Sequence, residues 1–440
     1  MADDSTSKVV AGASRPGTFA SLSNPDYRHY YTGQGVSLIG TWLQAAAVRW
    51  LVYEQTGSAT LLGVIEVANL MPGLLFGLFA GAVSDRVRPR SMILAMEFGQ
   101  MSCAFMLAIL VASGVVQFWQ MAVILAMARV FVSFAQPSRQ VYLYELVGPE
   151  SLGNAIALNS GLFNATRVLG PALAGLGLEL VGAAWCFALN GISHFAAIGA
   201  VFAIRVADRP MPALSGGAAM RTVLAGLYYL RDEPRITRLL ALMGFFGFMG
   251  MGYESMTPIY ATQVLGAKVG GYGLILACGG AGATVGALMV ARLGDTYRKD
   301  RTAVLGLLIF ATSLLLAAVH PQWVAPRWPV FARLAAGGAC LLGAGFGAAV
   351  YYSSTQTLIQ ISIPPHLRGR IMGVWMVVFS GSVPLGALWT GRAASVWGVT
   401  PVMTFSAVVC IATGLFLLAT DALAERPAPA KEPAGELQGE

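Results

Sequence analysis

Long apolar stretches recur along this 440-residue chain, and they constrain its fold more than any other feature. A helix needs roughly 20 apolar residues to cross the hydrocarbon core of a bilayer. Twelve stretches meet this length, near 31–54, 59–83, 91–114, 117–137, 153–180, 183–206, 239–265, 270–293, 302–322, 329–355, 369–395 and 399–420. The sequence therefore predicts an all-α membrane protein with twelve transmembrane helices.

The number and distribution of charged residues support a membrane environment and predict the orientation of the chain in it. Only 11% of the residues are charged, whereas a soluble domain carries about 25%. Basic residues gather in alternate loops, and the intervening loops contain only Lys268 and Arg327. Because Lys and Arg accumulate on the cytoplasmic side, we expect both termini to be cytoplasmic and the protein to lie in the inner (plasma) membrane. The net charge of +7 then reports topology and not a nucleic-acid partner.

Several chemistries have no signature in the sequence. The five cysteines lie inside apolar runs without Cys-x-x-Cys spacing, so we expect packing residues and no metal site. The sequence contains neither a phosphate-binding loop nor a hydrolase motif. We therefore expect no enzyme activity, no cofactor and no internal ATP motor.

The apolar stretches divide the chain into two halves of six, and an internal repeat relates them. The stretch 149–156 matches 364–371, and 169–175 matches 385–391, at an offset of about 215 residues. Duplicated six-helix units are typical of transporters built from parallel repeats. We expect a polar N-terminal tail without a signal peptide, a first bundle, a linker with a surface helix at 219–231, a second bundle and a disordered tail, at 1–27, 28–206, 207–238, 239–420 and 421–440.

The loop after the second stretch contains the sharpest motif. It resembles the loop signature of the major facilitator superfamily, Gly-x-x-x-Asp-Arg-x-x-Arg-Arg, through Gly81, Asp85, Arg86 and Arg90. Pro89 replaces the first of the paired basic residues. The resemblance implies a latch that holds the two halves together at the cytoplasmic side. The alternative is a basic loop that only sets topology.

Most of residues 25–420 is similar to one branch of that superfamily, the enterobactin-exporter-like transmembrane secretion effectors. The resembling runs are 40–44, 50–59, 136–140, 154–160 and 164–171. The resemblance implies two pseudo-symmetric six-helix bundles around a cavity that opens alternately to each side. It also implies export of a siderophore, an antibiotic or another amphiphile, without identifying which.

Two pairs of ionisable residues lie within the predicted spans. Such residues cost roughly 2.5–3.5 kcal/mol each by the lower scales and tend to face a partner or a cavity. Helical rise places Arg49 and Glu66 at one depth near the outer face, and Glu97 and Arg129 at one depth near the inner face. Each pair is either a structural ion pair or a pair that breaks and reforms as the cavity alternates.

Two further charges lie nearer the middle of their spans. Arg167 has Asn164 about one turn away on the same face. A cation at this depth suits an anionic substrate, a water-filled cavity or an ion pair with Glu254. Glu254 follows Gly247, Gly250 and Gly252, which loosen its helix. A carboxylate in a low dielectric gains proton affinity, so Glu254 is the favoured proton carrier.

Two weaker signals complete the candidate pathway. His194 lies alone in an apolar span, where a backbone carbonyl is its usual partner. Gly170 and Pro171 resemble part of the antiporter signature of drug–proton exchangers and predict a bend.

The sequence therefore predicts a monomeric secondary transporter that couples protons to the export of a small amphiphilic or anionic molecule. The alternatives are an importer or lipid-like flippase of the same fold, and a membrane sensor that transports nothing.

Overall fold

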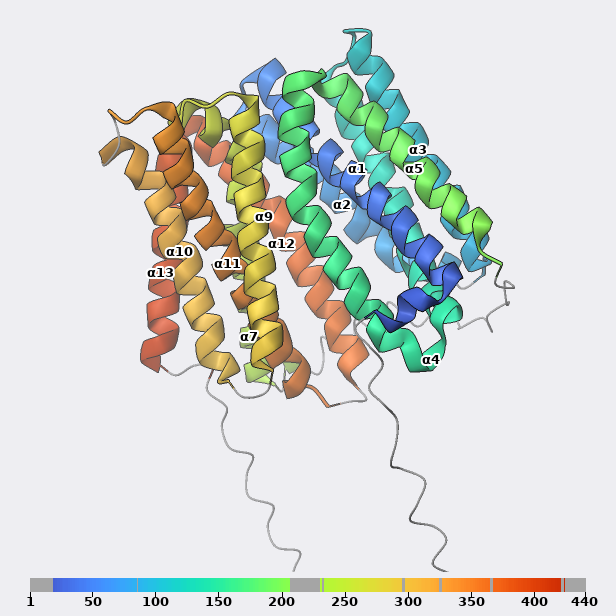
Figure 1. Cartoon of the computed structure of the whole chain (residues 1–440). Helices are drawn as coiled ribbons and strands as arrows, with labels where there is room; N and C mark the ends of the chain where they lie inside the picture. Colours follow the sequence, from blue (N-terminus) through green and yellow to red (C-terminus); the bar gives the residue numbers. More distant parts are fainter. Residues whose placement is uncertain are drawn as a thin grey trace, which may run out of the picture. The chain divides into compact units, whose positions relative to one another are not determined.

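The computed structural model describes residues 19–84, 86–205, 230–231, 233–294, 297–323, 327–364, 367–420 and 423. Regular structure in these residues is entirely helical (Figure 1). Eleven of the described helical segments are long and apolar enough to span a membrane. One of them, α4, has 63 residues and contains two of the predicted spans. The all-α membrane fold predicted from the sequence is thus confirmed.

The first half of the chain begins with the short 3₁₀ turn η1 (Ala20–Ser23) and continues in five long helices. These are α1 (Pro25–Thr56), α2 (Ala59–Ser84), α3 (Pro89–Ala112), α4 (Phe118–Leu180) and α5 (Gly182–Ala203).

The second half contains one broken helix followed by five long ones. The broken helix comprises α7 (Pro234–Phe245), η2 (Phe246–Gly250), η3 (Met251–Met256), α8 (Thr257–Ile259) and η4 (Tyr260–Val264). The long helices are α9 (Val269–Leu293), α10 (Lys299–Trp323), α11 (Val330–Ser362), α12 (Arg368–Trp397) and α13 (Val399–Thr420). The predicted surface helix at 219–231 lies almost wholly outside the described residues, as does the tail after Asp421.

Helix α4 differs from its prediction in the region between its two spans. The sequence predicts a helix end near Pro137 and a loop up to residue 152, but the helix continues through Pro137. Its backbone leaves helical geometry at Gly148, where φ is 69° and ψ is 174°. Glycine adopts this positive φ without the penalty that a side chain would add. The turn between the spans is therefore concentrated at one residue, and Arg139 lies on a helix instead of in a loop.

The chain forms two compact units that interleave in sequence. Unit 1 comprises Met1–Val48 and Leu75–Gly217, and unit 2 comprises Arg49–Leu74 and Ala218–Glu440. The end of α1 and the start of α2, which we call the 49–74 hairpin, thus belong to the unit formed by the second half of the chain. The periodicity of the sequence assigns these residues to the first bundle, since it carries no information on which bundle a helix end contacts.

Aromatic and hydroxyl side chains attach the 49–74 hairpin to the rest of unit 2. The hydroxyl of Thr262 donates a hydrogen bond to the Tyr53 hydroxyl at 2.8 Å. The ring centroids of Trp50 and Tyr272 are 5.6 Å apart. Such amphipathic rings combine a large apolar contact with a polar end that needs a partner. The hairpin is thereby held on η4 and α9.

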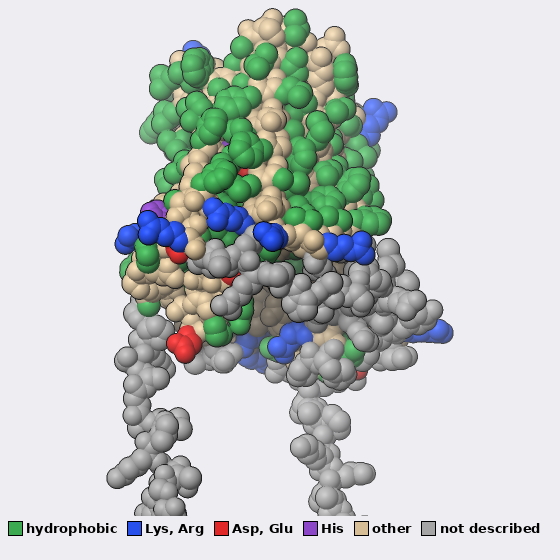
Figure 2. All heavy atoms as spheres, turned by 90° about the vertical axis from the view of Figure 1, so that its right-hand side faces the viewer, with side chains coloured by type: hydrophobic (Ala, Val, Ile, Leu, Met, Phe, Trp, Pro, Cys, Tyr) green, Lys and Arg blue, Asp and Glu red, His purple; other side chains and the backbone are tan. Residues whose placement is uncertain are grey.

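Lipid-facing residues cover the outer side of α3 and α5 in unit 1. Figure 2 shows hydrophobic side chains spread over this face, with basic side chains along one edge. Exposed apolar residues on these helices include Phe98, Ile109, Trp185, Phe195 and Phe202. In water such a continuous patch would mark an interaction surface; on a spanning helix it meets the acyl chains.

Small residues bring helix backbones close together in unit 2, as is common between helices in lipid. A Cβ atom added at Gly282 of α9 would overlap the backbone of Leu342 in α11. A Cβ atom at Gly345 of α11 would likewise overlap Gly279 of α9. These contacts are between backbones, so neither helix has a flexible side-chain end that can move aside.

Gly282→Ala should therefore destabilise the protein by about 1–3 kcal/mol, the usual cost of overpacking a tight contact. Gly77→Ala is the matched control, because a Cβ atom there would meet no described atom within 4 Å. Thermal unfolding in detergent should show a lower midpoint for Gly282→Ala only. Equal midpoints for both variants would show that α9 and α11 are packed more loosely than the structure indicates.

Candidate functional site

Each unit buries one group of charged side chains within its membrane-spanning helices. The Arg49 cluster of unit 2 consists of Arg49, Glu66, Glu254 and Tyr272. The Glu97 cluster of unit 1 consists of Gln34, Ser37, Glu97, Arg139 and His194.

The Arg49 cluster is built around an ion pair inside the 49–74 hairpin. The Nε atom of Arg49 donates to Oε1 of Glu66 at 2.5 Å. Only 16% of the Arg49 side chain and 8% of the Glu66 side chain is exposed. The structure thus forms the pair predicted from equal depth in α1 and α2, and it places both charges out of water.

Two residues from the second half of the chain complete this cluster. Arg49 forms a side-chain hydrogen bond with Tyr272 of α9, whose side chain is fully buried. Arg49 also interacts electrostatically with Glu254 of η3, which is half-buried. One guanidinium therefore pairs with Glu66 and also interacts electrostatically with Glu254. The charge of these three side chains is −1 with both carboxylates ionised and zero when one of them binds a proton.

The backbone around Glu254 departs from regular α-helix. Residues 246–250 form a π-helical turn and residues 251–256 a 3₁₀ segment. Irregular turns within a helix often mark functional sites or hinges. A Cβ atom at Gly247 or Gly252 would overlap the side chains of Ser382 and Thr390 in α12. The glycines that predict a loosened helix thus also allow α12 to approach it beside Glu254.

The Glu97 cluster joins four helices of unit 1. Glu97 of α3 is fully buried and accepts a hydrogen bond from Nη2 of Arg139 in α4 at 2.5 Å. Its second oxygen lies 2.7 Å from Nδ1 of His194 in α5. From α1, the Gln34 amide lies 3.5 Å from Glu97, and the Ser37 hydroxyl lies 3.5 Å from His194 Nδ1. A carboxylate held by a guanidinium and an imidazole satisfies the rule that buried charges are paired.

The hydrogen bond to Glu97 decides the tautomer of neutral His194. An ionised carboxylate only accepts hydrogen bonds, so Nδ1 of His194 carries the hydrogen and donates it. The Nε2 atom is then the nitrogen without a hydrogen.

The partner of Glu97 differs from the sequence prediction. The sequence predicts Arg129 at matching depth, and the structure shows Arg139 and His194 as the partners of the carboxylate. The reason is the continuation of α4 through Pro137, which carries Arg139 to the depth of Glu97 on a helix. His194 was expected to bond a carbonyl and instead bonds this carboxylate. The sequence signal for this contact is the shared depth of two isolated polar residues, Glu97 and His194.

The candidate residues between 164 and 171 lie on the part of α4 that follows Gly148, in unit 1. The amide of Asn164 donates to the Ser160 carbonyl at 2.8 Å, and Arg167 is half-buried. Gly170 packs against Trp42 of α1, and Pro171 is buried. Helical dihedral angles continue through 170–171, since Gly148 is the site of the departure in α4. Binding of substrate by Arg167 and Asn164 and bending at Gly170 and Pro171 remain predictions.

The predicted latch loop is only partly visible. Asp85 lies outside the described residues, and Arg86 is exposed. Arg90 donates to the Phe202 carbonyl at 3.3 Å, in the last turn of α5. A cation at a helix C-terminus meets unsatisfied carbonyls and a favourable dipole. A Cβ atom at Gly81 would meet none of the described atoms within 4 Å. The latch role of Gly81, Asp85, Arg86 and Arg90 remains a prediction.

Metal chemistry finds no support in the described ranges. Among them, no group of three His, Cys, Asp or Glu side chains is placed to hold a metal ion. What the two clusters can do chemically is bind protons and exchange ion-pair partners.

Comparison with known proteins gives the family. Residues 16–437 match the family model described as transmembrane secretion effector. The chain is 22% identical over 392 residues to the staphyloferrin A transporter of Staphylococcus aureus, covering 87% of this chain and 94% of the relative. It is 22% identical to macrolide efflux protein A of Streptococcus pyogenes, covering 87% and 93%. It is 24% identical to the enterobactin exporter EntS of Shigella boydii, covering 88% of both chains.

Solved structures give the fold. The nucleoside transporter NupG superposes with a TM-score of 0.71 at 10% identity, covering 90% of this chain and 99% of NupG. A D-xylose–proton symporter superposes with a TM-score of 0.68 at 13% identity, covering 88% and 97%. Both have the major facilitator fold that the sequence predicts, and the matched family contains transporters and not enzymes. This multi-pass membrane protein therefore belongs to the transmembrane secretion effector family of major facilitator superfamily transporters.

Proposed function

We propose that the protein exports a small amphiphilic or anionic molecule in exchange for protons, by alternating access. Relatives named for export or efflux of enterobactin and a macrolide support this substrate class. The Arg49 cluster supports proton coupling. In it, the largely buried guanidinium of Arg49 pairs with Glu66 and interacts electrostatically with Glu254, which is half-buried on an irregular helix.

Proton binding changes the charge of this cluster and hence its preferred packing. With Glu254 ionised, Arg49 is attracted to η3 as well as to Glu66. With Glu254 protonated, only the Glu66 pair remains, and the attraction between the 49–74 hairpin and η3 weakens. A buried charge interacts far more strongly than one in water. Uptake of one proton is thus able to loosen the hairpin from η3 within unit 2, which is the kind of step that alternating access needs.

Glu254→Gln should abolish transport driven by a pH gradient while leaving substrate exchange intact. Glutamine keeps the shape and removes the proton site, so only steps that need proton release should stop. We would measure uptake into everted vesicles with a panel of enterobactin, staphyloferrin A and a macrolide. Gradient-driven uptake should fall at least about a hundredfold, the lower end of the range for loss of a proton-transfer group.

Glu179→Gln is the matched control, because Glu179 is an exposed carboxylate at the end of α4. It should transport like the unmodified protein. Full gradient-driven uptake by Glu254→Gln would remove Glu254 from the coupling step. Uptake only in right-side-out vesicles would favour the importer, and no transport of any panel member or lipid probe would favour the sensor.

A further inference from the structure

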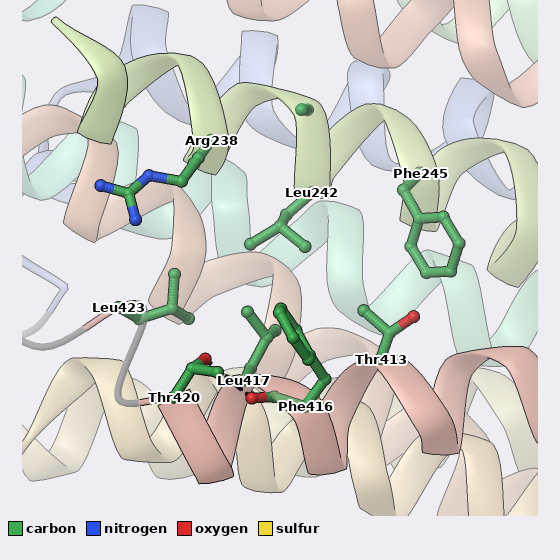
Figure 3. A pocket seen from close by; sticks show the side chains of 9 residues that line it. Arg238, Leu242, Phe245, Thr413, Phe416, Leu417, Thr420 and Leu423 are labelled. Atoms are coloured by element: carbon green, nitrogen blue, oxygen red, sulfur yellow. Dashed lines mark hydrogen bonds between the residues drawn. The ribbon is translucent and has the colours of Figure 1, made fainter.

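A groove in unit 2 lies between α7 and α13, and none of its lining residues belongs to the Arg49 cluster. Its volume is about 580 Å³. Figure 3 shows its lining side chains, which come from α7 on one side and from α13 and Leu423 on the other. The groove exists because the two helices pack on different neighbours: α7 on α11 and α12, and α13 mainly on α10. Helix α13 packs on the broken helix at η2, beyond the end of α7.

The groove is polar at one end and apolar along its length. Arg238 lies opposite Leu423 and Thr420 at one end, and Phe245 lies towards Thr413 at the other (Figure 3). Leu242 and Leu417 line the part between these ends. Arg238 and Phe245 are seven residues apart, a rise of about 10 Å along a helix. The groove thus has the polarity of an amphiphile with a charged head and an apolar chain.

Arg238 has hydrogen-bonding capacity to spare. Its Nε atom donates to the Pro234 carbonyl at 3.2 Å, and in the described part of the chain this is the hydrogen bond that the guanidinium makes. The side chain is exposed. A guanidinium offers five N–H donors in a fork that matches phosphate oxygens. The polar end of the groove is therefore suited to a phosphate group.

The groove opens towards acyl chains. Phe416, which lines it, is 63% exposed, and its neighbours Leu415 and Leu418 are exposed as well. On a span of mean hydropathy 2.3, such residues face lipid. The distribution of basic loop residues predicts that Arg238 is at the cytoplasmic end, where anionic lipids attract basic residues near the membrane surface.

We propose that this groove is a binding site for one anionic phospholipid, with its phosphate on Arg238 and an acyl chain along Leu242, Phe245 and Leu417. A neutral lipid would fill the apolar part equally well. It would lack the net negative charge that complements Arg238, and the specificity of the site therefore resides in this one side chain. The proposal is independent of substrate and of proton coupling.

Native mass spectrometry of the full-length protein tests the site with two probes, phosphatidylglycerol and phosphatidylcholine with the same acyl chains. The unmodified protein should bind one phosphatidylglycerol at least tenfold more tightly than phosphatidylcholine. Arg238→Gln should remove this preference, and Arg238→Lys should retain most of it. Ala241→Trp, in the groove wall, should weaken binding of both lipids.

Arg301→Gln is the matched control, since Arg301 is an exposed arginine in the first turn of α10 and does not line the groove. It should bind both lipids like the unmodified protein, and all variants should keep the same thermal midpoint. Equal binding of the two lipids by the unmodified protein overturns the proposal. So does an unchanged preference in Arg238→Gln. A full-length chain that binds neither probe also overturns it.

Discussion

Arg49→Glu alone should reduce transport at least about a hundredfold, and Arg49→Glu combined with Glu66→Arg should recover a large part of it. The single reversal places three carboxyl groups in one cluster and removes the guanidinium that pairs with Glu66. Removing one partner of a buried ion pair costs about 3–5 kcal/mol, a factor of about a hundred or more. The double reversal restores one positive and one negative charge at the two paired positions.

Recovery should be incomplete, because the reversed pair places its cation on α2 and changes its distance to Glu254 and Tyr272. Transport and thermal midpoint would both be measured, to separate folding from function. Arg327→Glu serves as the control, since Arg327 is exposed and reversal of an exposed charge has a small effect. If the double reversal is no better than either single change, Arg49 and Glu66 do not act as a pair during transport.

Glu97→Gln should lower both stability and transport by a large amount, because it leaves Arg139 and His194 without their carboxylate. The expected destabilisation of about 3–5 kcal/mol again follows from the stranding of a buried charge. Glu97→Gln combined with Arg139→Gln removes the stranded cation and should recover most of the stability. The difference between the single and double changes measures the coupling of the two residues.

Transport by this double variant distinguishes the two interpretations of the cluster. We expect stability to return and transport to remain low, as for a pair that breaks and reforms in the transport cycle. Return of both properties would show that Glu97 and Arg139 only hold α3 and α4 together. A Ser102→Ala variant, which changes an exposed hydroxyl on α3 that bonds its own helix, controls for general perturbation of α3.

Much of the fold follows from hydropathy alone. In a bilayer, backbone groups must be satisfied within the spanning element, so the apolar stretches are helices. The exception is instructive. The sequence predicts a break of many residues between the two spans of α4. The helix instead continues through Pro137, and Gly148 alone supplies the turn. Hydropathy locates the apolar cores of the spans, but it does not show how far their helices extend beyond them.

The amino-acid sequence by itself determined that lipid is the solvent of this protein and that Arg49, Glu66, Glu97 and Glu254 are charges that need partners. Only the tertiary structure decided which partners they have. Glu97 meets Arg139 and His194 because the extension of α4 and the packing of α3 on α5 bring them to one depth. Arg49 bonds Tyr272 and interacts electrostatically with Glu254 because the 49–74 hairpin packs with the second half of the chain. Helical periodicity gives the depth of a side chain, whereas its neighbours depend on how helices far apart in sequence are rotated and packed.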